Sequence, residues 1–409
     1  TIAQGAWNST FGKVGGPMEL AGGKVRLLDV NNSSTRPVFN HDVTVKEGTS
    51  STIIGTTRGA VNGKFKGTGT LTIESNGVRS DIGADFSAFA GTLNVVGSNF
   101  RLMDNVTDMK QTSVKMQAGS VMSHYQSNSG TQTAITTHIG SLASTASDCT
   151  LGHSLDSYYV GYDGKSTSYA GLLKAKTIVK TGEGTLTIKT GGSTSSINVK
   201  GGALIINNNP ISTAFDAITT GSITIDNGAM LMGRGCGNAL IVKNGGTVVP
   251  YSETLVGKLR MAGNVTLQTG SRLVIKAKVS DTGINTNDML RVNGTLTHGN
   301  DTIEIRILGD RILEVGEELT IIETGGQHKG TYTIKTVSAN QQLEWDDSRL
   351  LTEGVLVVKS AVTTAIDGPV NDDNSNGDAY TLDGVKVPMP KHGGSHRRPY
   401  IINGKKVLY

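Results

Sequence analysis

Hydrophobic and polar residues alternate in short segments of this chain, and glycine-rich corners separate the segments. The phrase GTGTLTI at Gly67–Ile73 returns as GEGTLTI at Gly182–Ile188, and looser copies begin at Gly91, Gly201, Gly221, Gly245 and Gly294. Alternation with a period of two is typical of strands that bury one face. A unit that recurs at roughly 18–22 residues is typical of a stacked solenoid, because one unit cannot bury its apolar face alone. We therefore predict an all-β solenoid.

The pattern divides the chain into parts. Residues 1–360 form the predicted solenoid, with the most regular repeats at about 176–300, where Asn-Gly corners such as Asn227-Gly228 separate very short strands. At about 301–360 charges become more frequent and the strands lengthen, so we expect capping rungs there. Residues 361–378 are a polar run that we interpret as a flexible linker. Residues 379–409 follow as a small β module with a hairpin around Asn403-Gly404.

Composition and charge exclude some functions. The chain has 54 glycines but only 8 prolines, which argues against collagen and Pro-rich linkers. The formal net charge of +4 is small, and no basic stripe with interleaved aromatics appears, so we expect no nucleic-acid partner. No apolar run approaches the ~18 residues of a membrane span. The opening residues Thr1–Trp7 read like the middle of a repeat, so we expect the C-terminal part of a longer exported protein.

The two cysteines, Cys149 and Cys236, lie about four repeats apart. Rungs stacked about 4.8 Å apart would separate them far beyond the reach of a disulfide. Two free thiols that fill gaps in the core are therefore the favoured interpretation over a bridge.

A loop in the linker has the spacing of a calcium site. Asp372, Asn374 and Asn376 supply oxygens at positions 1, 3 and 5, and Asp383 supplies a carboxylate at position 12. This spacing resembles an EF-hand loop, but position 12 is not glutamate and no helices flank it. A solvated linker is therefore the default interpretation and a Ca²⁺ site is the alternative, and no other cofactor is expected.

Four tyrosines cluster at Tyr158, Tyr159, Tyr162 and Tyr169. Aromatic faces can stack on sugar rings, which makes these residues candidate glycan contacts. The same positions coincide with the strand pattern, so packing is the competing interpretation, and the one that the pattern favours.

Other chemistry-bearing residues favour no catalytic site. The acidic pairs Glu317-Glu318 and Asp346-Asp347, the latter near Arg349, read as surface charge in the expected cap. His392 and His396 lie in a glycine-rich loop without fixed geometry. We therefore predict no catalytic residue.

Two stretches resemble a known repeat. Ile178–Ile188 (IVKTGEGTLTI) followed by Val199–Leu204 (VKGGAL), and later Asp288–Leu296 (DMLRVNGTL), resemble the autotransporter-associated β-strand repeat over residues 130–310. That resemblance implies a right-handed parallel β-helix in the passenger region of an exported, surface-displayed protein. It implies no catalytic residues.

The tail resembles the C-terminal sorting module of Bacteroidetes-type secreted proteins. The matching residues are Tyr380, Leu382, Gly384 and Val387 in its first half and Tyr400, Ile401, Gly404, Lys405 and Lys406 in its second. The resemblance implies recognition by an export and sorting machinery and a secreted or bacterial cell-surface location.

These observations lead to two functional hypotheses. The first is the non-catalytic β-helical stalk of an exported cell-surface protein, adhesive or in contact with polysaccharide or a host surface. The second is an accessory or C-terminal region of a secreted polysaccharide lyase or glycoside hydrolase.

Overall fold

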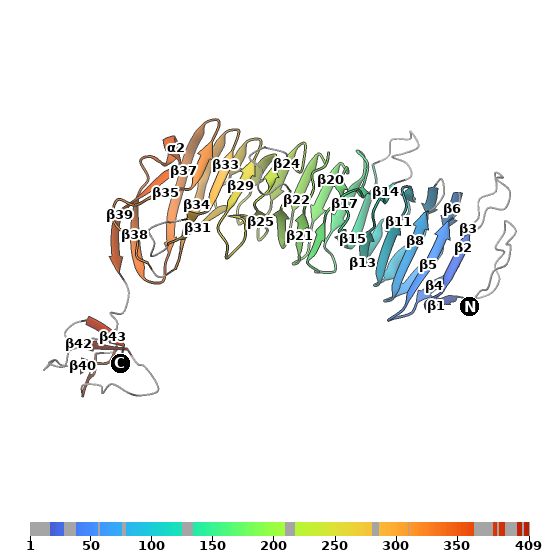
Figure 1. Ribbon diagram of the computed structural model, residues 1–409, viewed down its shortest axis with the longest axis horizontal. Helices are drawn as coiled ribbons and strands as arrows, with labels where there is room; N and C mark the ends of the chain where they lie inside the picture. The colour runs from blue at the N-terminus through green and yellow to red at the C-terminus, as the bar shows by residue number, and fades with distance from the viewer. Residues whose placement is uncertain are drawn as a thin grey trace.

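The structure is a computed structural model that describes residues 17–27, 38–55, 58–75, 79–124, 134–208, 217–279, 286–309, 311–363, 379–382, 384–388, 399–402 and 405–408. Nearly all regular structure in these residues is β-strand, and the one helix that they contain is the short α2 (Leu350–Glu353). Figure 1 shows the strands stacked in one long row from β1 to β37. We call this stack the prism.

The chain runs along three faces of the prism in turn, and the strands of each face stack in parallel on those of the preceding coil. The first face consists of β1 (Met18–Leu20), β4 (Val43–Val45), β7 (Lys64–Gly67), β10 (Asp85–Phe89), the first half of β13 (Asp108–Met116) and of β15 (Thr136–Ala143), β17 (Ser157–Val160), β20 (Thr177–Lys180), β22 (Ser196–Val199), β24 (Ser222–Ile225), β27 (Ala239–Val242), β30 (Val265–Leu267), and the first half of β34 (Leu296–Leu308) and of β37 (His328–Val337).

The second face follows in the same order. It consists of β2 (Lys24–Leu27), β5 (Ser50–Gly55), β8 (Thr70–Ser75), β11 (Thr92–Val96), the second halves of β13 and β15, β18 (Thr167–Tyr169), β21 (Thr185–Ile188), β23 (Ala203–Ile206), β25 (Met230–Gly233), β28 (Thr247–Pro250), β31 (Arg272–Lys278), and the second halves of β34 and β37.

The third face consists of two sheets. They contain β3 (Val38–Phe39), β6 (Arg58–Val61), β9 (Arg79–Ile82), β12 (Phe100–Leu102), β14 (Val121–His124), β16 (Thr150–Leu151) and β19 (Leu172–Leu173), and then β26 (Cys236–Gly237), β29 (Lys258–Met261), β33 (Met289–Val292) and β36 (Ile322–Thr324). Neighbouring strands in all three faces are parallel, because each coil continues in the direction of the one before it. The predicted all-β parallel β-helix is confirmed.

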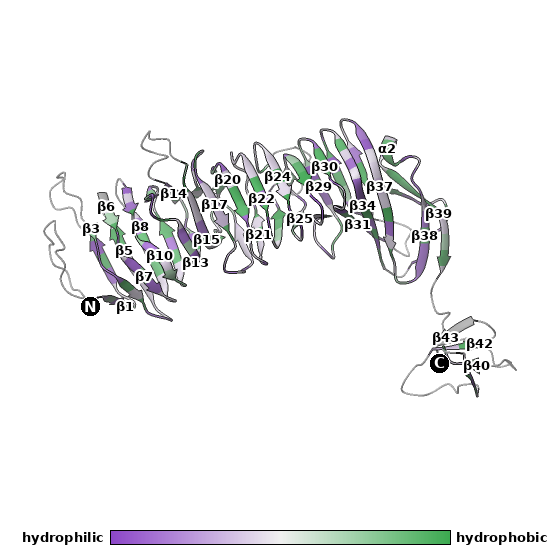
Figure 2. Cartoon of the chain, turned by 180° about the vertical axis from the view of Figure 1, so that it is seen from behind, coloured by the Kyte–Doolittle hydropathy of each residue, from purple (hydrophilic) through white to green (hydrophobic). Residues whose placement is uncertain are grey.

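Apolar side chains form continuous ladders inside the prism. Ile197, Ile223, Leu240, Val265 and Leu296 occupy equivalent positions on successive coils, and each is at most 1% exposed. Their strands alternate between buried and partly exposed residues, as the period of two predicted. Figure 2 shows hydrophobic and hydrophilic residues interspersed along the strands of the stack. Full burial of each aliphatic side chain contributes about 1.5–3 kcal/mol, and only the adjacent coils provide it.

The N-terminal coils use aromatic side chains for the same purpose. Phe39, Phe65, Phe86 and Phe89 are at most 1% exposed, and consecutive ring centroids lie 6.4, 5.2 and 6.1 Å apart. These tilted contacts are within the range of favourable aromatic pairs. The core therefore continues into the N-terminal coils, where the sequence repeat is less regular.

Glycine at the corners allows adjacent coils to approach closely. Gly182 has a φ of +67°, and a β-carbon there would lie 2.0 Å from the carbonyl oxygen of Gly161 on the preceding coil. A larger residue would force the two corners apart. Gly67, Gly91 and Gly221 of the sequence pattern likewise mark places where a backbone carbonyl of the preceding coil lies against the glycine.

Antiparallel strands cover the C-terminal end of the prism. β38 (Gln341–Asp346) and β35 (Glu318–Thr320) pair with either side of β39 (Val355–Thr363), and the indole nitrogen of Trp345 donates to the hydroxyl of Thr336 at 2.8 Å. A further strand, β32 (Thr286–Asn287), pairs antiparallel with β31. Parallel stacking therefore ends at β37, within the 301–360 region of the expected cap.

The last described residues of the chain form a small β-sheet. β40 (Ala379–Tyr380), β41 (Lys386–Val387), β42 (Pro399–Ile402) and β43 (Lys405–Leu408) form an antiparallel sheet. Cys149 and Cys236 are both buried and are not joined by a disulfide, so the interpretation as core thiols is confirmed.

Candidate functional site

The four candidate tyrosines divide into two buried and two accessible residues. Tyr158 and Tyr169 are 0% exposed and belong to the core, so the predicted glycan contact is wrong for both. Tyr158 and Tyr159 are adjacent on β17, and successive side chains of a strand point to opposite faces. Tyr159 therefore lies on the outer side of the first face, and Tyr162, in the turn after β17, is 39% exposed.

The accessible tyrosines surround a histidine from the preceding coil. His138 on β15 is in register with Tyr159 on β17, and their ring centroids lie 4.8 Å apart. The ring of Tyr162 meets His138 edge-on at 5.4 Å, and its hydroxyl lies 2.8 Å from His138 Nδ1. We call His138, Tyr159 and Tyr162 the aromatic cluster. It presents three rings on the surface of two adjacent coils.

Two lysines lie over the rings of this cluster. Lys110 Nζ is 5.7 Å from the centroid of Tyr162, and Lys200 Nζ is 5.9 Å from that of Tyr159. Lys110 also forms an ion pair with Asp108 at 3.3 Å. Cations at this distance are attracted to the ring faces. The cluster is therefore amphipathic, with flat apolar rings bordered by positive charge.

The protonation of the cluster follows from burial and from Lys110. Burial lowers the pKa of His138, Lys110 lowers it further, and Asp108 works in the opposite direction. Burial raises the pKa of Tyr162. A neutral imidazole and a neutral phenol can share the hydrogen bond between them, and neither ring carries charge that would repel a neutral sugar.

A carboxylate fixes the turn that carries Tyr162. Asp163 Oδ2 accepts hydrogen bonds from Ser141 at 2.7 Å and Ser113 at 3.0 Å, and Lys165 Nζ lies 3.3 Å away. Burial alone would raise the pKa of Asp163, but the hydrogen bonds outweigh it and hold the pKa below its usual value. The turn is thereby tied to two preceding coils, which preorganises the aromatic cluster.

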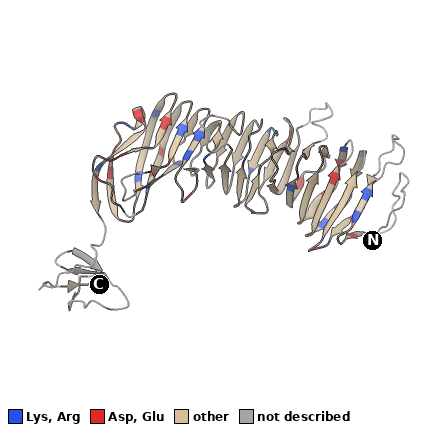
Figure 3. Ribbon diagram, in the orientation of Figure 1, with Lys and Arg blue, Asp and Glu red and all other residues tan. Residues whose placement is uncertain are grey.

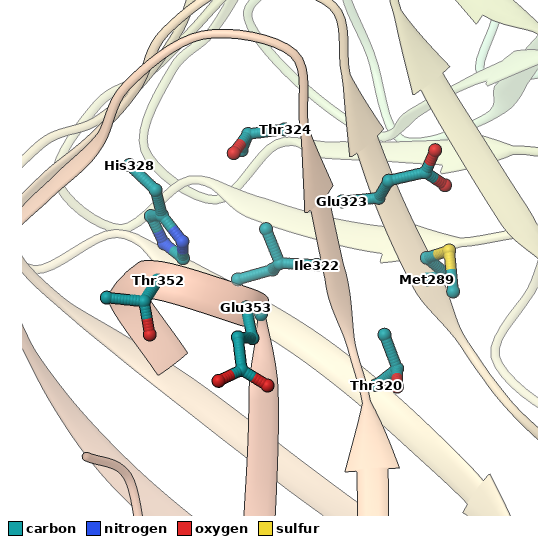
Figure 4. A pocket seen from close by; sticks show the side chains of 9 residues that line it. Met289, Thr320, Ile322, Glu323, Thr324, His328, Thr352 and Glu353 are labelled. Atoms are coloured by element: carbon teal, nitrogen blue, oxygen red, sulfur yellow. The ribbon is translucent and has the colours of Figure 1, made fainter. Parts of the chain in front are cut away.

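A separate pocket of about 230 Å³ lies beside the cap, next to β36 and α2. Figure 4 shows the imidazole of His328 directed toward Ile322, while the carboxylates of Glu323 and Glu353 point away from it. Glu323 is ion-paired with Arg291 at 3.0 Å, and Glu353 with Arg349 at 2.6 Å. Both carboxylates are therefore committed to salt bridges rather than directed at a shared point in the pocket.

Behind this pocket His328 is linked to the prism interior. His328 Nε2 lies 2.9 Å from Nε2 of His298, whose Nδ1 lies 2.9 Å from a carboxylate oxygen of Asp301. Burial, followed by His298, lowers the pKa of His328 to about 4. We call these three residues the histidine chain. The sequence analysis did not anticipate it, because stacking alone brings His328 against His298.

The remaining candidate residues are placed as follows. The calcium-loop residues Asp372, Asn374, Asn376 and Asp383 lie outside the described residues, as do His392, His396 and Gly404. Among the sorting-type residues, Tyr380 is on β40, Tyr400 on β42, Lys405 and Lys406 on β43, and Leu382 and Gly384 are in the turn between β40 and β41. The part of the chain that the structure describes contains no group of three metal-ligating side chains.

Both residues of the acidic pair Glu317-Glu318 in the cap have ion-pair partners. Arg349 contacts Glu318 as well as Glu353, and Glu317 contacts Arg311. Their interpretation as surface charge agrees with these ion pairs.

Comparison with known proteins gives no match, either among protein-family models or among curated proteins. Among the described residues no helix has the length and apolar character needed to cross a bilayer.

Proposed function

We propose that this β-helix is a non-catalytic stalk or passenger region of an exported protein displayed on a bacterial cell surface, and that it contacts carbohydrate through the aromatic cluster. The observation that carries the binding role is the accessible arrangement of His138, Tyr159 and Tyr162 on a rigid, flat face. Sugar rings present apolar C–H faces that stack on such rings, and the neighbouring hydroxyls find hydrogen-bond partners at its edge.

The surface location rests on sequence resemblance and on architecture. Repeats like those at Ile178–Leu204 are typical of autotransporter passengers, and the tail from Tyr380 resembles a sorting module that an export machinery recognises. A solenoid of stacked coils suits a stalk, because it extends a long surface from a simple repeat.

A glycan array tests the binding role. The wild-type chain is expected to bind at least one glycan class, and Tyr159→Ala combined with Tyr162→Ala is expected to weaken that binding about tenfold, since each aromatic contact contributes about 0.5–1.5 kcal/mol. Tyr251→Ala is the matched control, because its ring also lies under a cation, Arg234, at 4.8 Å. Binding that survives the double substitution would contradict the proposed site.

The second candidate function is that of an accessory or C-terminal region of a secreted polysaccharide lyase or glycoside hydrolase. The histidine chain favours it, because a carboxylate orients one histidine and that histidine contacts another at the wall of a pocket. The ion pairs of Glu323 and Glu353 favour the non-catalytic alternative. Release of oligosaccharides from pectins or glycosaminoglycans by this chain, lost in His328→Ala, would replace the first proposal.

A further inference from the structure

A second surface feature lies on the outer side of the second face, near the C-terminal end of the prism. Strands β31, β34 and β37 are in parallel register there, so that Arg272 is opposite Thr302 and Glu304 is opposite Lys335. The alternate residues Leu273 and Ile303 are buried in the core. Figure 3 shows lysine, arginine and acidic residues on the strands of these last coils.

These outward residues line a groove of about 320 Å³. It crosses strands from four neighbouring coils, and its lining residues are Gly245, Gly246, Thr247, Gly270, Ser271, Arg272, Thr302, Glu304 and Lys335. Four strands at the usual spacing span roughly 14 Å. The groove is open to solvent, and the glycines at one end carry no side chains that could close it.

One buried carboxylate organises the positive charges of this groove. Glu304 is 4% exposed and accepts from Arg306 Nε at 2.7 Å and from Arg272 Nη1 at 3.3 Å. Arg272 also reaches the hydroxyl of Thr247 at 3.4 Å. Burial alone would raise the pKa of Glu304, but Arg306, Arg272 and Lys335 outweigh this effect and lower the pKa. The carboxylate is therefore ionised and holds both guanidinium groups in place.

The charges around Glu304 do not balance. Arg272, Arg306 and Lys335 bring three positive charges against one negative charge. Lys335 is exposed, and among the described residues it has no ion-pair partner within salt-bridge distance. Guanidinium groups that are already fixed lose less conformational entropy when they bind an anion. The groove is thus preorganised for negatively charged ligand groups.

We propose that this groove binds an acidic polysaccharide, with ring carboxylates or sulfates contacting Lys335 and Arg272. A linear polymer suits the site because the groove is open and crosses several coils, so that successive sugar units can lie along it. The hydroxyls of Thr247 and Thr302 provide polar partners for uncharged positions of the same ligand. None of these residues belongs to the aromatic cluster, so the two binding proposals stand or fall separately.

Titration calorimetry with the full chain tests this proposal. Polygalacturonate is the carboxylate probe, dextran sulfate is the sulfate probe, and fully methyl-esterified polygalacturonate is the neutral comparison. We expect salt-sensitive binding of at least one charged polymer and none of the esterified polymer to the groove. Lys335→Gln is expected to weaken the binding about tenfold, since it replaces a charge-assisted hydrogen bond by a neutral one.

Lys115→Gln is the matched control, because Lys115 is an exposed lysine on β13 of the same face, many coils away. Equal losses in Lys335→Gln and Lys115→Gln would reduce the effect to overall charge and overturn the proposal. So would equal binding of the esterified polymer, or no binding of either charged polymer. Inorganic phosphate that binds as tightly as the polymers and depends on Lys335 would identify a free-anion site instead. Unchanged polymer binding in the Tyr159→Ala, Tyr162→Ala variant would separate this site from the aromatic cluster.

Discussion

The ammonium group of Lys180 donates a hydrogen bond of 3.1 Å to the carbonyl oxygen of Gly201 on the next coil. It also donates to the carbonyls of Thr181 at 2.6 Å and Gly182 at 2.9 Å. Lys180 is 1% exposed and occupies an inward position between Val160 and Val199. One buried cation therefore connects two corners of the prism.

Replacement of Lys180 by methionine is expected to destabilise the prism at pH 7. The substitution keeps the apolar stem but leaves the corner carbonyls without their donor, which costs about 1–3 kcal/mol for a buried polar group. Chemical denaturation of both proteins measures the difference. A variant as stable as the wild type would show that water replaces the ammonium without cost.

The same lysine predicts a dependence on pH. Burial lowers the pKa of Lys180 from 10.5 to about 8. Between these two values the unfolded chain binds more protons than the folded one, so stability due to this residue increases as the pH rises from about 8 to 10.5. The full difference is about 3 kcal/mol, at 1.36 kcal/mol per pKa unit. Denaturation of the wild type and of Lys180→Met at pH 7.5 and 10 should show that the wild type gains stability relative to the variant as the pH rises. A stability difference that is the same at both pH values would contradict the lowered pKa.

Two glycines separate the contribution of close contact from that of backbone strain. Gly182 and Gly228 have similar φ values of +67° and +73°, but a β-carbon at Gly228 would have no atom within 4 Å. Gly228→Ala should cost about 1 kcal/mol from the left-handed conformation, and Gly182→Ala should cost more, because it also meets the carbonyl of Gly161. Thermal melts of the two variants make the comparison. Equal melting temperatures would show that the corner can open without cost.

The histidine chain predicts acid sensitivity of the cap. The pKa of His328 is lowered to about 4 from an ordinary value of 6.5, so between these values the unfolded chain binds more protons. The stability that depends on neutral His328 is therefore lost as the pH falls from 6.5 toward 4. Hydrogen exchange of α2 and β39 should accelerate over this range in the wild type and less in His328→Phe. Acceleration of the same size in both proteins would assign the effect to other groups.

Lys110 predicts the titration of the aromatic cluster. It is the second cause, after burial, of the lowered pKa of His138, and Asp108 opposes it. NMR titration should give a pKa below 6.5 for His138 in the wild type and a higher one in Lys110→Gln. A pKa of His138 that falls in the variant would contradict this prediction, because it would show that Lys110 does not lower that pKa.

Much of the fold could be predicted, because one local rule repeats. The TLTI segment Thr185–Ile188 forms a strand with alternating burial, and its register with Ala203–Ile206 follows from the repeat. The course of β34 was harder to foresee, because it runs through a corner as one strand and pairs with both β30 and β31. The expected Gly299-Asn300 is present at that corner, and Asn300 has a φ of +68°, but it shifts the register of the strand instead of ending it.

The site could be predicted only in part. The four tyrosines are close in sequence, which suggests a single cluster. The alternation along β17 instead places Tyr158 and Tyr159 on opposite faces of the strand, and this signal received too little weight. His138 was missed because its partner Tyr159 lies one coil later, so the two residues are neighbours in the stack but not in the sequence. The groove at Glu304 depends on the register of four strands, which the pattern of a single strand does not contain.

The most direct test of carbohydrate contact is NMR of the tyrosine rings in the ¹³C-labelled chain, titrated with a glycan that binds on the array. The account predicts saturable shifts for Tyr159 and Tyr162 and no shift for the buried Tyr158 and Tyr169, which act as internal controls. Shifts of all four rings, or of none while the glycan binds, would contradict it.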